Sequence, residues 1–367
     1  MKSIADLLGD YQAVFSFFRE YEKYFYDDLT KEHILLINIL KIVETNRADF
    51  KIYTGKKGRP LYNRMRLFHC FIARSILQIS TVNKLIDRLN VDRNLKRICG
   101  YDYEDKIPDE STFSRAFAEF SDSKIGEKYH NKMIENHIKD EIIGHISRDS
   151  TAIESRETPI NKKKDIVKKS KRKRGRPRKD EIIDNKNPSN LEKQVNQTIT
   201  GAILALNQDA AWGCKKNSQG KVSAWKGYKL HLDVSDVGIP ISVVLSGANV
   251  HDSQLAIPME KMTSSKCTYL YSLMDAAYDA EIIHNFIRNS GKIPIIDENK
   301  RRKEKIGFDP AKKVRFKIRS TVERCNSHLK DWLFGQAIYV KGHKKVMNYL
   351  MYGVICLTAM KILQYGY

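Results

Sequence analysis

Apolar residues recur at helical spacing throughout the first part of the chain, where no segment alternates in the way that strands do. Amphipathic helices are predicted over four segments: 7–18, 34–42, 66–79 and 81–89. The stretch PDESTFSRAF, residues 108–117, begins a further helix, for which Asp109 or Ser111 is the candidate cap. Because the pattern continues to about residue 140, the chain is predicted to begin with an all-helical domain, of a kind that often binds DNA or mediates dimerisation.

The pattern changes after residue 141, where short apolar runs typical of strands begin. These runs cover 142–147, 226–234, 240–247, 269–275 and 293–296. Asp236, Val237 and Gly238 separate the second run from the third and predict a hairpin turn. Helical segments at 253–262 and 280–289 alternate with the later strands. The sequence therefore predicts an α/β domain after the helical one.

The most apolar segment, residues 346–363, has the length of a membrane span. Asn348 and Lys361 interrupt it and charged residues surround it, so a buried core helix is the better interpretation. The N-terminal sequence MKSIADLLGDYQ lacks the apolar core of a signal peptide. We therefore expect a protein with no membrane partner.

A basic insert separates the first two predicted strands. Residues 161–197 are rich in Lys, Arg and Asn and poor in apolar residues, so they are predicted to form a disordered or loosely ordered loop. The centre of the insert, KRKRGRPRK, resembles an AT-hook, in which Arg-Gly-Arg-Pro lies extended in the minor groove of A·T-rich DNA. The alternative is a generic basic linker. The candidate DNA-binding residues here are Lys171, Arg172, Lys173, Arg174 and Arg176.

Composition and charge narrow the class of partner. The chain has 367 residues, 41% of them hydrophobic and 30% charged, as in soluble globular proteins of two domains. Its 65 Lys and Arg against 44 Asp and Glu give a net charge of +21, which favours a polyanionic partner, above all nucleic acid. The six cysteines are scattered without metal-binding spacing, which indicates reduced thiols, no structural zinc site and a cytoplasmic or nucleoid location.

One helical stretch, IRSTVERCNSHLK at residues 318–330, places charged residues on a single face beside an apolar stripe. Arg319, Glu323 and Lys330 share that face because they lie at positions i, i+4 and i+11. An ordinary solvated ion pair is one interpretation. With Arg placed N-terminal to Glu the pair has the weaker orientation, so stability alone explains the pattern poorly. Both interpretations stay open on this segment alone.

Three acids stand out by their positions. Asp149 follows the first strand, Asp275 ends a later strand, and Glu323 lies on the helix just described. Carboxylates so placed could hold two Mg²⁺ ions, which prefer oxygen ligands. One ion would activate a water or a 3′-hydroxyl, and the other would stabilise the leaving oxygen of a phosphodiester. Singly, each acid also has an ordinary explanation, as a turn residue, a helix cap and an ion-pair member respectively.

The order of the motifs resembles a known family. The succession DST, GYKLHL, PISVVLSGANVHDS, MDAAYD and R-x-x-x-E-x-x-x-x-x-x-K is similar to the catalytic domain of bacterial insertion-sequence transposases of the DDE type, in the broad IS4/IS5/IS1182 grouping. The stretches GRPLYNRMRLFHCFIARSILQIS and PDESTFSRAF resemble the helical N-terminal domain of the same elements. The likeness covers roughly residues 55–365, and its C-terminal signature is the most specific part.

The resemblance implies a fold and a site. It implies an RNase H-like catalytic domain, a mixed sheet flanked by helices, at residues 141–367, interrupted by the insert at 161–197 and preceded by a helical DNA-binding or dimerisation domain at 1–140. It further implies that Asp149, Asp275 and Glu323 bind two Mg²⁺ or Mn²⁺ ions, and that Arg319 and Lys330 hold DNA phosphates. The family signature begins with Tyr where this chain has Phe316, so a phenolic contact is lost there and only stacking or packing remains.

Some nearby residues are weaker candidates. Asp252 is most simply the N-cap of the helix that follows it, and His251 is a possible substrate contact. Trp212 and Trp225 are candidates for stacking on an unpaired base, whereas Tyr228 is expected to pack in the core.

These features together predict a DNA transposase that binds double-stranded DNA at the inverted repeats of its own element, as a homodimer. It would hydrolyse the 3′ ends and transfer them to target DNA in the bacterial cytoplasm, associated with the nucleoid. The alternatives are a stand-alone RNase H-like nuclease and a non-catalytic architectural DNA-binding protein derived from a transposase. The large helical domain argues against the first alternative, and the three intact acids argue against the second.

Overall fold

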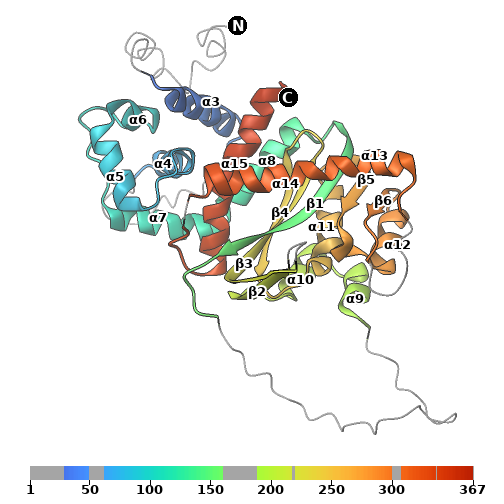
Figure 1. Ribbon diagram of the computed structural model, residues 1–367. Coiled ribbons are helices and arrows are strands. Elements are labelled where there is room, and N and C mark those ends of the chain that lie inside the picture. Colours follow the sequence, from blue (N-terminus) through green and yellow to red (C-terminus); the bar gives the residue numbers. More distant parts are fainter. Residues whose placement is uncertain are drawn as a thin grey trace, which may run out of the picture.

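A six-stranded mixed sheet and a group of helices pack side by side in the computed structural model (Figure 1). The structure describes residues 29–48, 62–159, 188–216, 220–299, 307–335 and 337–366. The helix predicted at 7–18 lies outside these residues, as does the centre of the basic insert.

The described residues before β1, up to His137, form helices, as predicted, and we call this part the helical half. The helices are α3 (Lys31–Thr45), α4 (Arg64–Ile76), α5 (Val82–Val91), α6 (Arg93–Ile98), α7 (Glu110–Ser123) and α8 (Ile125–His137). The predicted cap Asp109 accepts a hydrogen bond from the Thr112 amide at the start of α7, and Ser111 donates its hydroxyl to Asp109 instead of capping. Thr81 caps α5 in the same way.

The sheet has the order β2-β3-β1-β5-β6, and β4 pairs with β3. Its strands are β1 (Ile142–Glu154), β2 (Ala211–Lys216), β3 (Val222–Ser235), β4 (Pro240–Gly247), β5 (Thr268–Met274) and β6 (Ile293–Ile296). Strands β1, β5 and β6 are parallel, whereas β3 is antiparallel to β1, β2 and β4. The hairpin predicted between the second and third runs joins β3 to β4.

The first strand is longer than predicted, and this changes the place of Asp149. The sequence suggested a strand that ends at Ser147, with Asp149 directly after it, but β1 continues to Glu154. The reason is the long strand β3, which pairs with β1 from Ile146 to Glu154 and keeps the chain extended. Asp149 therefore lies inside a strand, opposite Leu232.

Helices cover the sheet and link its strands. The shorter elements are α9 (Asn190–Asn196), α10 (Ile199–Leu204), the 3₁₀ turn η2 (Asp252–Leu255), α11 (Ala256–Ser264), the 3₁₀ turn η3 (Ala276–Tyr278) and α12 (Glu281–Asn289). Helix α9 falls at the end of the predicted basic insert, and its N-terminus has a capping box between Ser189 and Glu192. The described end of the insert is therefore helical.

A nearly continuous helical rod crosses one face of the sheet (Figure 1). It consists of α13 (Pro310–Phe316), the 3₁₀ turn η4 (Lys317–Arg319), α14 (Ser320–His328) and the π-helical turn η5 (Leu329–Leu333). Val322, Cys325 and Leu329 are buried against the sheet, so the predicted apolar stripe is the packed face of this rod.

The last helix, α15 (His343–Tyr365), returns to the helical half and packs against α3, α4, α7 and α8. In the described part of the chain it alone is long and apolar enough to cross a membrane, but most of it is buried inside the fold. This agrees with the predicted core helix. The packing also means that residues from the end of the chain complete the core of the helical half.

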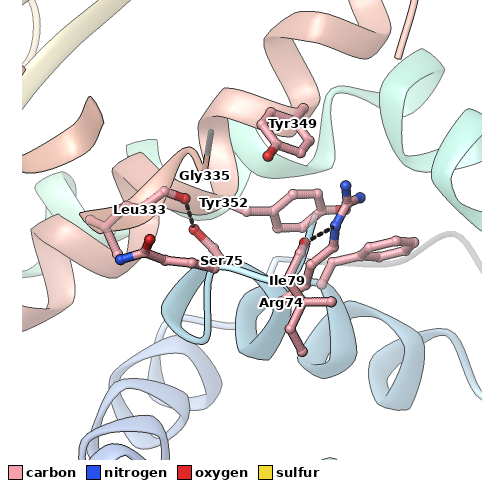
Figure 2. Close-up of a pocket in the computed structure, with 9 residues that line it drawn as sticks. Arg74, Ser75, Ile79, Leu333, Gly335, Tyr349 and Tyr352 are labelled. Carbon is pink, nitrogen blue, oxygen red and sulfur yellow. Dashed lines mark hydrogen bonds between the residues drawn. The ribbon is translucent and has the colours of Figure 1, made fainter. Parts of the chain in front are cut away.

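Polar contacts fasten the rod to the helical half around a small cavity of about 10 Å³, room for about one water molecule (Figure 2). The Ser75 hydroxyl on α4 donates to the Leu333 carbonyl at 2.7 Å. The buried Arg74 guanidinium lies over the Tyr349 ring at 5.0 Å and donates to the Ile79 carbonyl at 2.9 Å. The end of η5 is therefore held in place by α4 and α15.

Candidate active site

A cavity of about 550 Å³ opens beside β1, at the point where β5 ends. Strand β5 pairs with β1 only as far as Ser147, whereas β1 continues for seven residues beyond it. Among the described residues, one edge of this part of β1 therefore has no strand partner. Asp149 lies on this edge, Asp275 directly follows β5, and both side chains line the cavity.

The environment of the two acids opposes their ionisation. Burial raises the pKa of Asp149 to about 6, and the nearby charge of Asp275 adds to the effect, although the Ser150 amide donates to the Asp149 carboxylate. Burial likewise raises the pKa of Asp275, against a hydrogen bond of 3.0 Å from the Ala277 amide. Asp275 also caps the short turn η3, so the capping role considered for it is confirmed.

Glu323 is not in the cavity with the other two acids. Its side chain is 52% exposed and forms an ion pair with Arg319. Its helix does face the site, since the Asn326 amide lies 3.4 Å from the Asp149 carboxylate. Within the described residues, no three side chains of His, Cys, Asp or Glu lie close enough together to hold a metal ion. The structure therefore brings two of the three predicted ligands together and leaves the third on the neighbouring helix.

Cations surround the acids. Lys330 on η5 and Lys215 on β2 both line the cavity, and burial followed by the charge of Lys215 lowers the pKa of Lys330. Arg319 carries a positive charge close enough to favour ionisation of Asp149 and Asp275. Phe316 stacks obliquely on Phe308 with ring centroids 4.9 Å apart, which fits the packing role left to it by the loss of a hydroxyl.

Lys229 and Asp252 line the same cavity, although the sequence interpretation did not place them there. The predicted N-cap role of Asp252 is wrong, because the His251 side chain caps η2 and Asp252 instead binds the Lys229 ammonium at 3.0 Å. Burial opposes ionisation of Asp252, but the charges of His231 and Lys229 hold the pKa of Asp252 below its usual range. A lone Lys in the apolar strand run GYKLHL was the available signal for this pair.

The three aromatic candidates have different environments. Tyr228 is buried, as expected, and its hydroxyl donates to Glu157 at 2.8 Å. Trp225 is also buried, and its indole N–H donates to the Tyr228 carbonyl at 3.1 Å. Trp212 is 61% exposed on the edge strand β2. Trp212 is therefore the most exposed of the three rings, while Trp225 lines the catalytic cavity.

A buried ionic cluster anchors β1 next to Asp149. The Arg148 guanidinium donates to both carboxylate oxygens of Asp233, at 2.6 and 2.7 Å, and to Glu260 at 3.2 Å. It also donates to the Ala256 carbonyl at 2.9 Å, and its side chain is fully buried. Successive residues of a strand point to opposite faces, so this cluster holds the far side of β1 while Asp149 faces the rod.

The basic residues proposed to contact the minor groove lie outside the described part of the chain. They are Lys171, Arg172, Lys173, Arg174 and Arg176.

A mixed sheet with one acid inside its first strand and another directly after the neighbouring parallel strand, crossed by a helix that carries a third acid, is the arrangement of RNase H-like DDE domains. The family model described as Transposase DDE domain matches residues 142–359, and the model described as Transposase domain (DUF772) matches residues 23–119. Because the first match covers more than half of the chain, the protein belongs to the DDE transposase family. No curated protein and no solved structure shows a significant match to the chain.

Proposed function

We propose that the protein is a DNA transposase that binds the terminal inverted repeats of its own element as a homodimer, hydrolyses their 3′ ends and joins them to target DNA. The observation that carries the proposal is the cavity in which Asp149 and Asp275 lie together under a rim of Lys215 and Lys330. Cleavage of a phosphodiester with metal ions needs neighbouring carboxylates to bind the ions and cations to bind the phosphates, and this cavity contains both.

The acids present suit hard divalent cations. Asp149 and Asp275 supply only oxygen donors. A cation between them would stabilise their charged forms, which burial and nearby negative charge otherwise oppose by raising the pKa values of both groups. Two Mg²⁺ or Mn²⁺ ions bound there would activate the attacking water or 3′-hydroxyl and stabilise the leaving oxygen. Glu323 would complete the set of ligands after its side chain leaves Arg319.

The other residues of the site would bind and orient the substrate. Once Glu323 turns to the cavity, Arg319 loses its ion-pair partner and becomes available to a DNA phosphate. Lys330 lies on the π-helical turn η5, whose end is held by the hydrogen bond from Ser75 to Leu333, and would bind a second phosphate. Arg319 and Glu323, which share one helical face, would thus bind a DNA phosphate and a metal ion respectively.

The remaining basic regions would supply affinity for the ends. The helical half would recognise the terminal repeats, and the insert with Lys171, Arg172, Lys173, Arg174 and Arg176 would add contacts to the minor groove. Since each neutralised phosphate releases counterions, binding should weaken steeply with salt. The site of action would be the bacterial cytoplasm, on nucleoid DNA.

A joining assay tests this function. The intact protein is incubated with labelled DNA that carries the repeats flanking its gene, an unlabelled target plasmid, and Mg²⁺ or Mn²⁺. We expect cleaved 3′ ends that become covalently joined to the plasmid. Cleavage without joining would indicate a stand-alone nuclease, and tight binding without cleavage would indicate an architectural protein.

A further inference from the structure

A second cavity lies directly beside the catalytic one. It has a volume of about 470 Å³ and shares Ala152 and Lys330 with the catalytic cavity. Lys330 therefore stands between the two, so a chain bound at the acids could continue past it into the second cavity. We call this second cavity the strand groove.

The strand groove combines an apolar floor with a basic rim, and an exposed aromatic ring lies against the rim. Ile153, Phe334 and Ile338 line it, and each is at most 8% exposed. Arg156 lies at the rim, and its guanidinium is 5.2 Å from the ring centroid of Tyr339, which is 43% exposed.

One acid, Glu154, also lines the groove, but it lies close enough to Lys330 for the two charges to interact. Within the part of the chain that the structure describes, Arg156 has no ion-pair partner. A cation on the rim is therefore available to an anionic ligand.

These properties match a single DNA strand better than a duplex. Single strands are bound by cations that follow the backbone and by aromatic rings on which bases stack, whereas a duplex hides the faces of its bases. The volume lies in the range of pockets that hold ligands of nucleotide size. An apolar floor offers nothing to a duplex backbone, but it can receive the face of an unpaired base.

We propose that the strand groove holds the single DNA strand that continues past the scissile phosphate, with Arg156 on a phosphate and Tyr339 against a base. The proposal rests on the proposed function for the position of the cut, since only a substrate held at Asp149 and Asp275 would lead a strand past Lys330. Neither Arg156 nor Tyr339 belongs to the catalytic residues.

Binding without metal tests the proposal separately from catalysis. Fluorescence anisotropy in the presence of EDTA compares a short mixed-sequence single strand with the duplex of the same length. We expect Tyr339→Ala to bind the single strand roughly ten-fold more weakly and the duplex unchanged. Arg156→Ala should flatten the plot of log affinity against log salt by about 0.7 for the single strand, the value for one lost phosphate contact.

The chain offers a matched control. Tyr103 is 56% exposed and is covered by Arg93 at 4.9 Å, so Tyr103→Ala removes the same kind of ring from the helical half and should leave single-strand affinity unchanged. The proposal is wrong if the intact protein does not bind the single strand, if Tyr339→Ala binds it as tightly as Tyr103→Ala, or if Tyr339→Ala loses duplex affinity equally. Failure of the joining assay would leave these results standing, because no metal and no cleavage enter them.

Discussion

The buried cluster around Arg148 allows a large effect on stability to be worked out from the structure. Arg148→Met would remove four hydrogen bonds to oxygen and leave Asp233, which is 0% exposed, as a buried carboxylate with no ion-pair partner among the described residues. Glu260, 1% exposed, would keep only Lys292 at 3.7 Å. Removing one partner of a buried ion pair costs about 3–5 kcal/mol, because the remaining charge has no compensation. For a folding unit of this size the loss corresponds to a fall of roughly 10 °C in Tm.

Thermal unfolding followed by circular dichroism measures the effect, with two controls. Lys344→Met removes a surface ion pair to Asp122 and should change Tm little, since exposed pairs contribute little. Combining Arg148→Met with Asp233→Leu should recover part of the loss, because the carboxylate that Arg148→Met leaves without a cation is then removed. If Arg148→Met alone unfolded at the same temperature as Lys344→Met, the argument from uncompensated charge would be refuted.

Three further predictions concern the candidate active site and the strands that support it. Because the pKa of Asp149 is raised from 3.8 to about 6, the folded protein keeps a proton that the unfolded chain has lost between these values. The free energy of unfolding should therefore fall as pH rises through this window, by up to about 3 kcal/mol. Chemical denaturation at several pH values measures this free energy, and Asp149→Asn should not show the fall. Gly227→Ala should lower the free energy of unfolding by roughly 2–3 kcal/mol, since φ is +146° and the new Cβ would lie 2.3 Å from the Ile153 carbonyl oxygen. Gly291→Ala, at positive φ but in open space, should lower it less when both variants are compared by thermal unfolding. Lys330→Ala should reduce the salt dependence of duplex binding by about 0.9, and an unchanged slope would remove Lys330 from the DNA contacts.

Local patterns predicted the elements of this fold well. The helices at 34–42 and 81–89, the hairpin before Pro240 and the strand predicted at 269–275 depend on nearby residues. The structure contains all of them, with the last strand ending one residue earlier, at Met274. The transposase family was also predicted correctly, because its motifs are short and ordered along the chain.

The features that the sequence did not predict depend on contacts between residues far apart in the chain. The extension of β1 past Ser147 requires the long strand β3, which begins more than seventy residues later. The sequence predicted that α15 is buried, but its place among the first helices depends on packing between residues far apart in the chain. The same holds for the site, where Asp252 pairs with Lys229 across the hairpin instead of capping its own turn.

We propose above that Asp149, Asp275 and Glu323 act together as the metal ligands of strand transfer. The most direct test compares cleavage and joining by the intact protein with Asp149→Asn, Asp275→Asn and Glu323→Gln, and with Glu281→Gln as an exposed helical control. We expect the three site variants to bind DNA but neither to cut nor to join it, while Glu281→Gln does both. Joining by Glu323→Gln at the rate of the intact protein would contradict the claim.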